Sequence, residues 1–215
     1  MYARTVDNKT LTLSVSGMLW NRSLVMQDKE TGSLWSHLLG RAMRGALQGQ
    51  SLDRLPGLMT DWKTWRKLHP QTTVLNMKRT SRKFRRQIYD EPRRFVVGYV
   101  DGDDARAWGF DQLLAAPLIN DALGSRPLLV VFDATSGTAF LFERRVDQRV
   151  LTMRRTADRL TDRETGSVWN AHTGRAVSGP LQGRQLKTLP AIVSFRKAWT
   201  VFHPETAFWK PANTP

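Results

Sequence analysis

The chain contains no cysteine. Disulfide bonds, thiolate nucleophiles and thiolate metal ligands are therefore all excluded. The sequence also has no run of about 18 uncharged apolar residues, so no membrane-spanning helix is predicted. Met1 is not followed by a charged start, an apolar stretch and a small-residue cleavage site, so no secretory signal is visible.

Acidic residues are the second scarce class. The 33 Lys and Arg outnumber the 19 Asp and Glu, and the formal net charge is +14. Residues 78–94 hold eight of the basic residues beside only two acids. This run predicts contact with a polyanion, which could be nucleic acid, anionic lipid or an acidic protein surface. The alternative is a solvated connector between two domains. The basic residues of the run are Lys78, Arg79, Arg82, Lys83, Arg85, Arg86, Arg93 and Arg94.

The chain contains much of itself twice. Residues 28–75 and 162–209 align without a gap at an offset of 134, and 21 of the 48 positions are identical. A repeat period this long indicates a duplicated domain rather than a solenoid. We expect a first copy at 1–77, a basic connector at 78–94, a second and nearly complete copy at 95–210, and a tail at 211–215.

The first copy is expected to be shortened at its N-terminus. Residues 4–13 match residues 144–153, and in the second copy a strongly apolar strand at 127–132 precedes that match. The first copy has no counterpart of this strand. We therefore expect a shared sheet or a groove between the copies, where the incomplete edge is covered.

Alternating segments and turn residues predict a β-rich α+β fold. Each copy reads as a small antiparallel meander whose tight turns include 28–32 and 162–166. One covering helix follows in each copy, at about 61–68 and 195–202, with Thr60 and Ser194 as the expected N-caps. We expect two related lobes in a pseudo-twofold arrangement. A further helix is predicted at 109–115.

Several strings resemble a known pattern. Residues 16–36 resemble SGLLYNSDLVMYDRETGSLWSQ, and Leu55-Pro56, Trp65 and His69-Pro70 resemble the downstream elements LP…W…HP. Residues 105–113 and 119–124 are similar to ARAYPLDVL…VVNDTLGG. These patterns belong to a bacterial family known as domain of unknown function 3179. The resemblance implies no established activity, and because members are often exported it favours an extracytoplasmic, periplasmic location.

The chain departs from this family at one motif. Typical members carry Cys-Pro-Leu-Cys-Gly after the apolar strand, whereas this chain has Asp133-Ala-Thr-Ser-Gly137. A Cys pair at that spacing could bind metal or perform redox chemistry, and neither is possible with thiols here.

Duplication selects the candidate ligand-binding residues. Trp35 with Arg41, and Trp169 with Arg175, could form a stacking platform with a charged handle for a carboxylate, a phosphate or a sugar. The alternative is a core tryptophan. His69 and His203 could ligate a metal or carry protons, or they could simply cap the ends of the two helices. The paired acids of the turns 28–32 and 162–166 are expected to accept backbone hydrogen bonds rather than to act in catalysis.

The sequence predicts no catalytic residue, no metal site and no cofactor. The leading hypothesis is a non-catalytic binding or accessory module that docks an acidic partner or a larger assembly through a basic surface. One alternative is a small-ligand-binding protein or enzyme that uses a groove between the lobes. Another is a periplasmic metal-handling protein. Non-specific binding of nucleic acid or anionic lipid also fits the charge.

Overall fold

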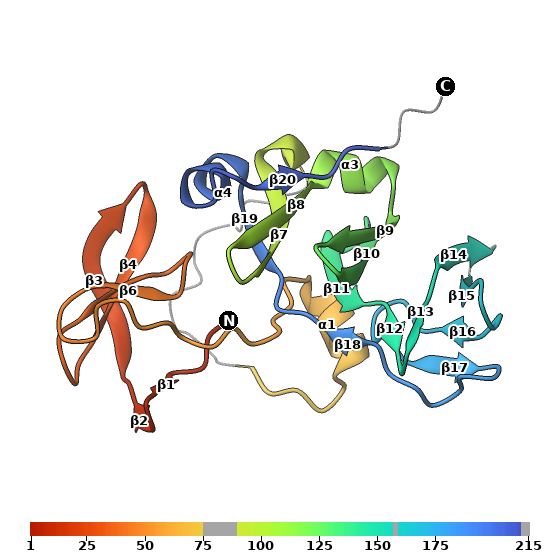
Figure 1. The fold of residues 1–215 in the computed structure, drawn as a ribbon, viewed down its shortest axis with the longest axis horizontal. Helices are drawn as coiled ribbons and strands as arrows, with labels where there is room; N and C mark the ends of the chain where they lie inside the picture. The colour runs from red at the N-terminus through yellow and green to blue at the C-terminus, as the bar shows by residue number, and fades with distance from the viewer. Residues whose placement is uncertain (75–89, 157–158, 212–215) are drawn as a thin grey trace.

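The computed structural model describes residues 1–74, 90–156 and 159–211 of the chain (Figure 1). Within these residues the fold is β-rich, with four four-stranded sheets and two short two-stranded hairpins. It also has three short α-helices, α1, α3 and α4, so the predicted β-rich class with antiparallel sheets is confirmed.

The first copy is an antiparallel meander in chain order. Its strands are β3 (Leu13–Trp20), β4 (Ser23–Asp28), β5 (Leu34–Ser36) and β6 (Arg41–Arg44), preceded by the hairpin of β1 (Thr5–Val6) and β2 (Lys9–Thr10). A small core closes this meander, with Trp35, Leu11 and Leu52 almost fully buried. It stands apart from the other sheets in Figure 1, in red to orange.

The second copy repeats this unit. The hairpin of β12 (Arg145–Val146) and β13 (Arg149–Val150) leads to β14 (Met153–Thr156), β15 (Arg159–Asp162), β16 (Val168–Trp169) and β17 (Ala176–Ser178). These four strands are again hydrogen-bonded in chain order. The turn chemistry shared by the two copies thus produces the same local meander.

Two further sheets are built mainly from the segment that only the second copy has. In one sheet β10 (Arg126–Asp133) lies between β9 (Leu118–Leu123) and β11 (Thr138–Glu143), and β18 (Lys187–Thr188) extends it. In the other, β7 (Phe95–Asp101) pairs with β8 (Asp104–Gly109), flanked by β19 (Ile192–Phe195) and β20 (Ala207–Phe208). Helix α3 (Phe110–Ala115) joins the two sheets, and the 3-10 turn η1 (Pro92–Arg94) precedes β7.

Strand β10 is buried on both faces. Leu128 and Val130 point into one apolar cluster with residues of β7 and α3, whereas Leu129 and Val131 point into another with Trp169. A strand covered on both sides needs a continuous apolar run, which explains the sequence Leu-Leu-Val-Val-Phe at 128–132. This strand therefore joins the second copy's meander to the sheet of β7 and β8.

The two equivalent helices begin one residue later than their expected caps. In α1 (Trp62–Leu68) the N-cap is Asp61, whose carboxylate accepts the Thr64 N–H at 2.7 Å, and not Thr60. In α4 (Arg196–Phe202) the N-cap position is Phe195, and no side chain caps the helix. The prediction of Ser194 as the N-cap was therefore also wrong. The Thr60 hydroxyl instead accepts a hydrogen bond from Thr138 of the second copy. Strand pairing of 192–195 with β7 moves the start of α4 past Ser194.

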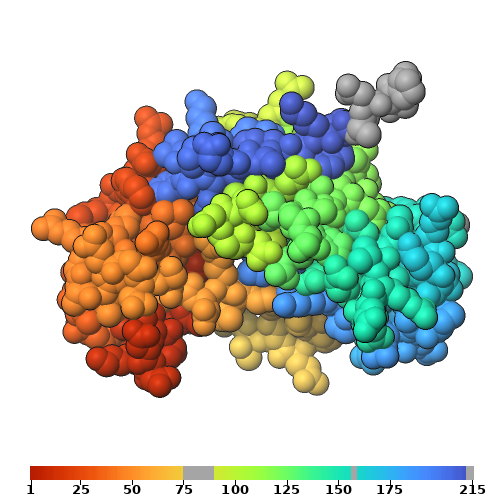
Figure 2. All heavy atoms as spheres, viewed as in Figure 1, coloured from red at the N-terminus to blue at the C-terminus, as the bar shows by residue number. Residues whose placement is uncertain are grey.

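The copies are in contact with each other, and Figure 2 shows the first copy, in red to orange, lying directly against the rest of the molecule. The Trp20 ring, at the tip of the β3–β4 hairpin, meets the Phe202 ring of α4 edge-on, with ring centroids 4.8 Å apart. On the other side, Leu58 and Leu68 of the first copy pack against the second copy's cluster around Phe140. Thr138 Oγ1 lies 2.7 Å from Thr60 Oγ1 and donates a hydrogen bond to it. Helix α1 accordingly contacts the second copy's core, while itself burying no residue completely.

We expect Gly98→Ala to destabilise the protein by about 2–3 kcal/mol, because an added Cβ would lie 2.3 Å from the buried Trp199 indole. The free energy of unfolding from a denaturant titration measures this. Gly102→Ala is the control, since its Cβ meets no atom within 4 Å and only its φ of +59° is strained, at a cost of about 1 kcal/mol. Equal costs for the two variants would contradict the close packing at Gly98.

Candidate functional site

The duplicated turn acids are structural. The Trp35 Nε1–H donates to Asp28 Oδ2 at 2.8 Å, and Trp169 donates to Asp162 Oδ2 at 2.9 Å. Thr31 donates both its N–H and its hydroxyl to Asp28, and the Ser33 hydroxyl then accepts the Leu47 N–H at 3.1 Å. The second copy has the same bonds at Thr165, Ser167 and Leu181. Each carboxylate is about 1% exposed or less, so it faces no ligand from solvent.

The electrostatics of Asp28 follow from this network. Burial opposes ionisation, but hydrogen bonds from Trp35 and Thr31 outweigh it and hold the pKa of Asp28 below its ordinary value. The exposed turn acid Glu30 accepts the Thr12 N–H at 2.7 Å and thereby ties the turn to the start of β3. Glu164 does the same with Thr152 at 2.8 Å.

A third version of the network lies in the turn 133–137, where the sequence departs from the motif of the family that it resembles. Asp133 Oδ2 accepts the Ser136 hydroxyl at 2.7 Å, and the oxygens of Ser136 and Thr138 are 2.6 Å apart. Ser136 and Thr138 are at most 1% exposed. The Thr138 hydroxyl donates a hydrogen bond to Thr60, so this turn contributes to the contact between the copies. Sequence comparison of the two copies could not find it, because the first copy lacks this segment.

The structure does not bring the candidate Trp and Arg side chains together. Trp35 is 0% and Trp169 is 3% exposed, and each lies in its copy's core. In the ladder Trp35 pairs with Ala42 while Arg41 pairs with Ser36. Neighbouring strand residues point to opposite faces, so Arg41 points away from the indole. Arg41 and Arg175 are both exposed at the start of equivalent turns.

The two candidate histidines cap their helices. The His69 N–H donates to Trp65 O, and the His203 N–H to Trp199 O, both at 2.8 Å. Each imidazole also lies against the tryptophan one turn earlier, with ring centroids 4.1 Å and 4.3 Å apart. They differ in environment, because His69 is exposed whereas His203 is half-buried and its Nε2 has no hydrogen-bond partner in the described residues. Burial and the nearby charge of Arg54 lower the pKa of His203 to about 4.

A basic groove lies between the copies. It has a volume of about 780 Å3, and the tip of the β3–β4 hairpin, η1 and α4 line it. Asn21 and Arg22 form the hairpin tip, and both have a positive φ, +48° and +63° respectively. Two successive residues of this kind make the tight turn that suits the strand twist. Trp20 holds this tip against α4, which brings Arg22 to the groove.

Among the described residues that line this groove, five are cationic and none is acidic. They are Arg22, Arg93, Arg94, Arg196 and Lys197, and Phe195 and Val201 provide apolar surface between them. Arg94 is paired with Glu91, and Arg196 with Asp111 at 2.9 Å. No ion pair among the described residues involves Arg22, Arg93 or Lys197. Their charges therefore remain available to an anion.

Of the predicted basic run, only Arg93 and Arg94 can be placed, and both line the groove. Lys78, Arg79, Arg82, Lys83, Arg85 and Arg86 lie outside the described residues. The sequence reasoning missed Arg22, Arg196 and Lys197. Arg196 could have been found by asking where the copies differ, since the equivalent residue of the first copy is Trp62. The candidate residues were instead chosen because both copies share them.

Two further features concern metals and membranes. In the described part of the chain no group of three or more His, Asp or Glu side chains could hold a metal ion. No helix there is long and apolar enough to cross a bilayer.

We expect Asp28→Ala to destabilise the protein by about 3 kcal/mol, because the buried Trp35 N–H and Thr31 lose a charged acceptor. Asp28→Asn should cost less, since an amide oxygen still accepts the indole N–H. Chemical denaturation measures both. Glu30→Ala is the matched control in the same turn and should cost much less. A loss for Asp28→Ala no larger than that control would refute the structural role.

We expect the stability of the protein to fall as the pH drops from about 6.5 to about 4. In this window the unfolded chain protonates His203, whereas the folded state keeps it neutral because its pKa is lowered. The loss from this residue should be about 1–2 kcal/mol, since solvent screens a half-exposed ring. His203→Phe should flatten the profile measured by urea unfolding, and His69→Phe, at the exposed equivalent position, should not. An unchanged profile in His203→Phe would contradict this assignment.

Comparison with known proteins agrees with the repeat. The chain matches the family described as "Protein of unknown function (DUF3179)" twice, over residues 1–92 and 89–206. No curated protein and no solved structure gives a significant match. The two matches together extend over nearly the whole chain, and they agree with the motifs at 16–36 and 105–124. The chain therefore belongs to the DUF3179 family and contains two copies of its domain in tandem.

Proposed function

We propose that this protein is a non-catalytic binding or accessory module that docks an acidic partner protein, or a larger assembly, through a basic surface. The observation that carries this proposal is the groove of about 780 Å3, whose described lining residues include five cations and no acid. Three of these cations have no ion-pair partner within the described residues. A concave surface of one charge sign concentrates ligands of the opposite sign and speeds their association.

The apolar part of the groove supports a protein partner over a bare polyanion. Phe195 is 45% and Val201 is 54% exposed, and the Arg94 guanidinium lies over the Phe195 ring at 5.6 Å. Aromatic and arginine side chains are enriched where proteins bind one another. An acidic segment with an apolar side chain would use both kinds of surface.

We also infer that the two copies form related lobes in a pseudo-twofold arrangement. Support comes from the shared order of a four-stranded meander followed by a helix, which is β3–β6 and α1 in the first copy and β14–β17 and α4 in the second. In such an arrangement the groove belongs to both lobes. Arg22 comes from the first and Lys197 from the second.

The test is binding of a fluorescent glutamate-rich peptide, followed by anisotropy at low and high salt. The Arg93→Glu/Lys197→Glu double variant should weaken binding at least about ten-fold at low salt, because it reverses two unpaired charges in the groove. The matched control is Lys9→Glu/Arg149→Glu, which reverses two exposed charges on the hairpins β1–β2 and β12–β13 and should change affinity less than about two-fold.

Two outcomes would overturn the proposal. Equal losses in the groove variant and in the control would mean that only the net charge matters. Tighter, groove-dependent binding of a single-stranded oligonucleotide or of anionic vesicles than of the peptide would assign the groove to that polyanion instead.

A further inference from the structure

Helix α1 presents a site whose counterpart in the second copy is filled by the chain itself. At the offset of 134, residues 58–61 correspond to 192–195, and Trp65 corresponds to Trp199. In the second copy, β19 (192–195) pairs antiparallel with β7, with Ile192 opposite Gly98. Strand β20 pairs parallel with β8. The β7–β8 hairpin thus lies between the segments before and after α4.

The Trp199 indole depends on that hairpin. It is fully buried with Val96, Ala105 and Ala107, all of β7 or β8. A Cβ at Gly98 would lie only 2.3 Å from the indole, so the ring rests directly on the main chain of β7. Glycine opposite the tryptophan is therefore part of the fit.

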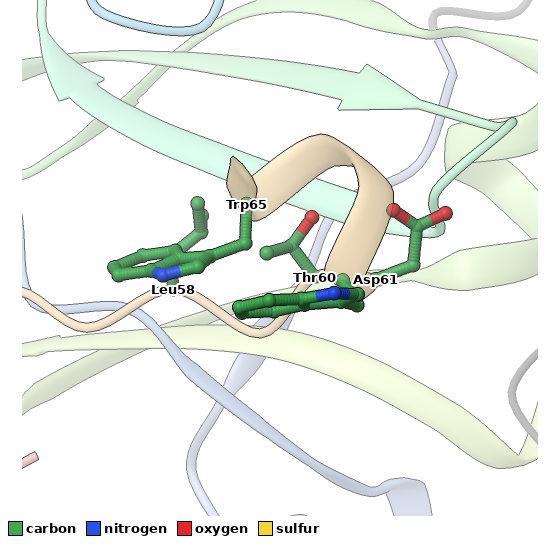
Figure 3. A pocket seen from close by; sticks show the side chains of 5 residues that line it. Leu58, Thr60, Asp61 and Trp65 are labelled. Atoms are coloured by element: carbon green, nitrogen blue, oxygen red, sulfur yellow. The ribbon is translucent and has the colours of Figure 1, made fainter. Parts of the chain in front are cut away.

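In the described residues no strand pairs with the equivalent segment of the first copy. Helix α1 buries no residue completely, Trp62 is 49% exposed and Met59 is 40% exposed. Within the described residues, Leu58, Met59 and Thr60 make no main-chain hydrogen bond to another main-chain group. An open hollow of about 360 Å3 lies over them, lined by Leu58, Thr60, Asp61, Trp62 and Trp65 (Figure 3). Three of these residues correspond to Ile192, Ser194 and Trp199, which contact or pair with β7 in the second copy.

The segment before α1 is already held in place for pairing. Thr60 is hydrogen-bonded to Thr138, Leu58 packs on the second copy's core, and Asp61 has an extended backbone with ψ of 161°. Figure 3 shows the Trp65 indole beside Leu58, with the Asp61 carboxylate directed away from it. An anchored, extended edge loses little entropy when a strand adds to it.

Charge complementarity indicates the kind of strand that fits. The β7–β8 hairpin, residues 95–109, carries three aspartates and one arginine, for a net charge of −2. Helix α1 exposes Lys63, Arg66 and Lys67. The equivalent helix α4, which holds this hairpin, begins with Arg196 and Lys197. The three exposed cations of α1 therefore suit an acidic hairpin.

We propose that α1 and the segment 58–61 form a docking site for an acidic β-hairpin of a partner protein, which adds to this edge and places a glycine against Trp65. Main-chain pairing supplies the affinity and the indole supplies the specificity. This site lies apart from the basic groove and does not depend on it.

The test uses a labelled peptide of residues 95–109 as the probe and the full-length protein as the receptor. We expect saturable binding by fluorescence anisotropy. The Gly98→Val peptide should bind at least about ten-fold more weakly, because its side chain occupies the space of the indole. Since this comparison uses the unaltered protein, it stands even where a protein variant fails to fold. Trp65→Ala in the protein should cause a similar loss, and Trp20→Ala, at another exposed tryptophan, should not.

The outcomes separate this proposal from the basic groove. Arg93→Glu/Lys197→Glu should leave affinity for the 95–109 peptide within about two-fold. No saturable binding, equal binding of the Gly98→Val peptide, equal binding of a scrambled peptide, or indifference to Trp65→Ala would each overturn the hairpin site. Self-association of the protein that is lost in Trp65→Ala would assign the site to a second copy of this chain and would likewise overturn the proposal for a foreign hairpin.

Discussion

A buried aspartate bonded to an indole N–H is the interaction on which each copy depends. Asp28 and Trp35 in the first copy, and Asp162 and Trp169 in the second, meet at 2.8 Å and 2.9 Å in almost fully buried positions. A buried carboxylate is tolerable only when it is hydrogen-bonded, so the threonine and serine between the two residues are required as well. This network closes the turn, orients the central tryptophan and connects it to the next hairpin.

The same constraint explains why duplication is a poor guide to function here. What both copies must keep is what folds them: the Asp–Thr–Ser–Trp network, the turn glycines and the helix-ending histidine. Chemistry that a partner or ligand could use lies where the copies differ. Arg196, which stands where the first copy has Trp62, lines the groove beside Arg22, and Trp65 is partly exposed where Trp199 is buried. The asymmetry between the copies, rather than their likeness, creates open surface.

The asymmetry between the copies follows from strand β10 of the second copy, which is buried on both faces. Because both faces of β10 are apolar, its sheet can cover its own meander on one side and β7 and α3 on the other. The face of this sheet that covers the second copy's meander also packs against Leu58 and Leu68 of the first copy. In this way the sheet of β10 contributes core to both copies.

The sequence by itself determined the β-rich class, the repeated turns and the approximate helices, because these follow from local patterns of glycine, acid and apolar residues. It also allowed the turn acids to be interpreted as backbone acceptors and the histidines as helix caps. Only the tertiary structure decided that Trp35 is core rather than platform, that Asp61 and not Thr60 caps α1, and which basic residues converge. Those outcomes depend on strand register and on contacts between residues as distant as Thr60 and Thr138, which no local pattern encodes.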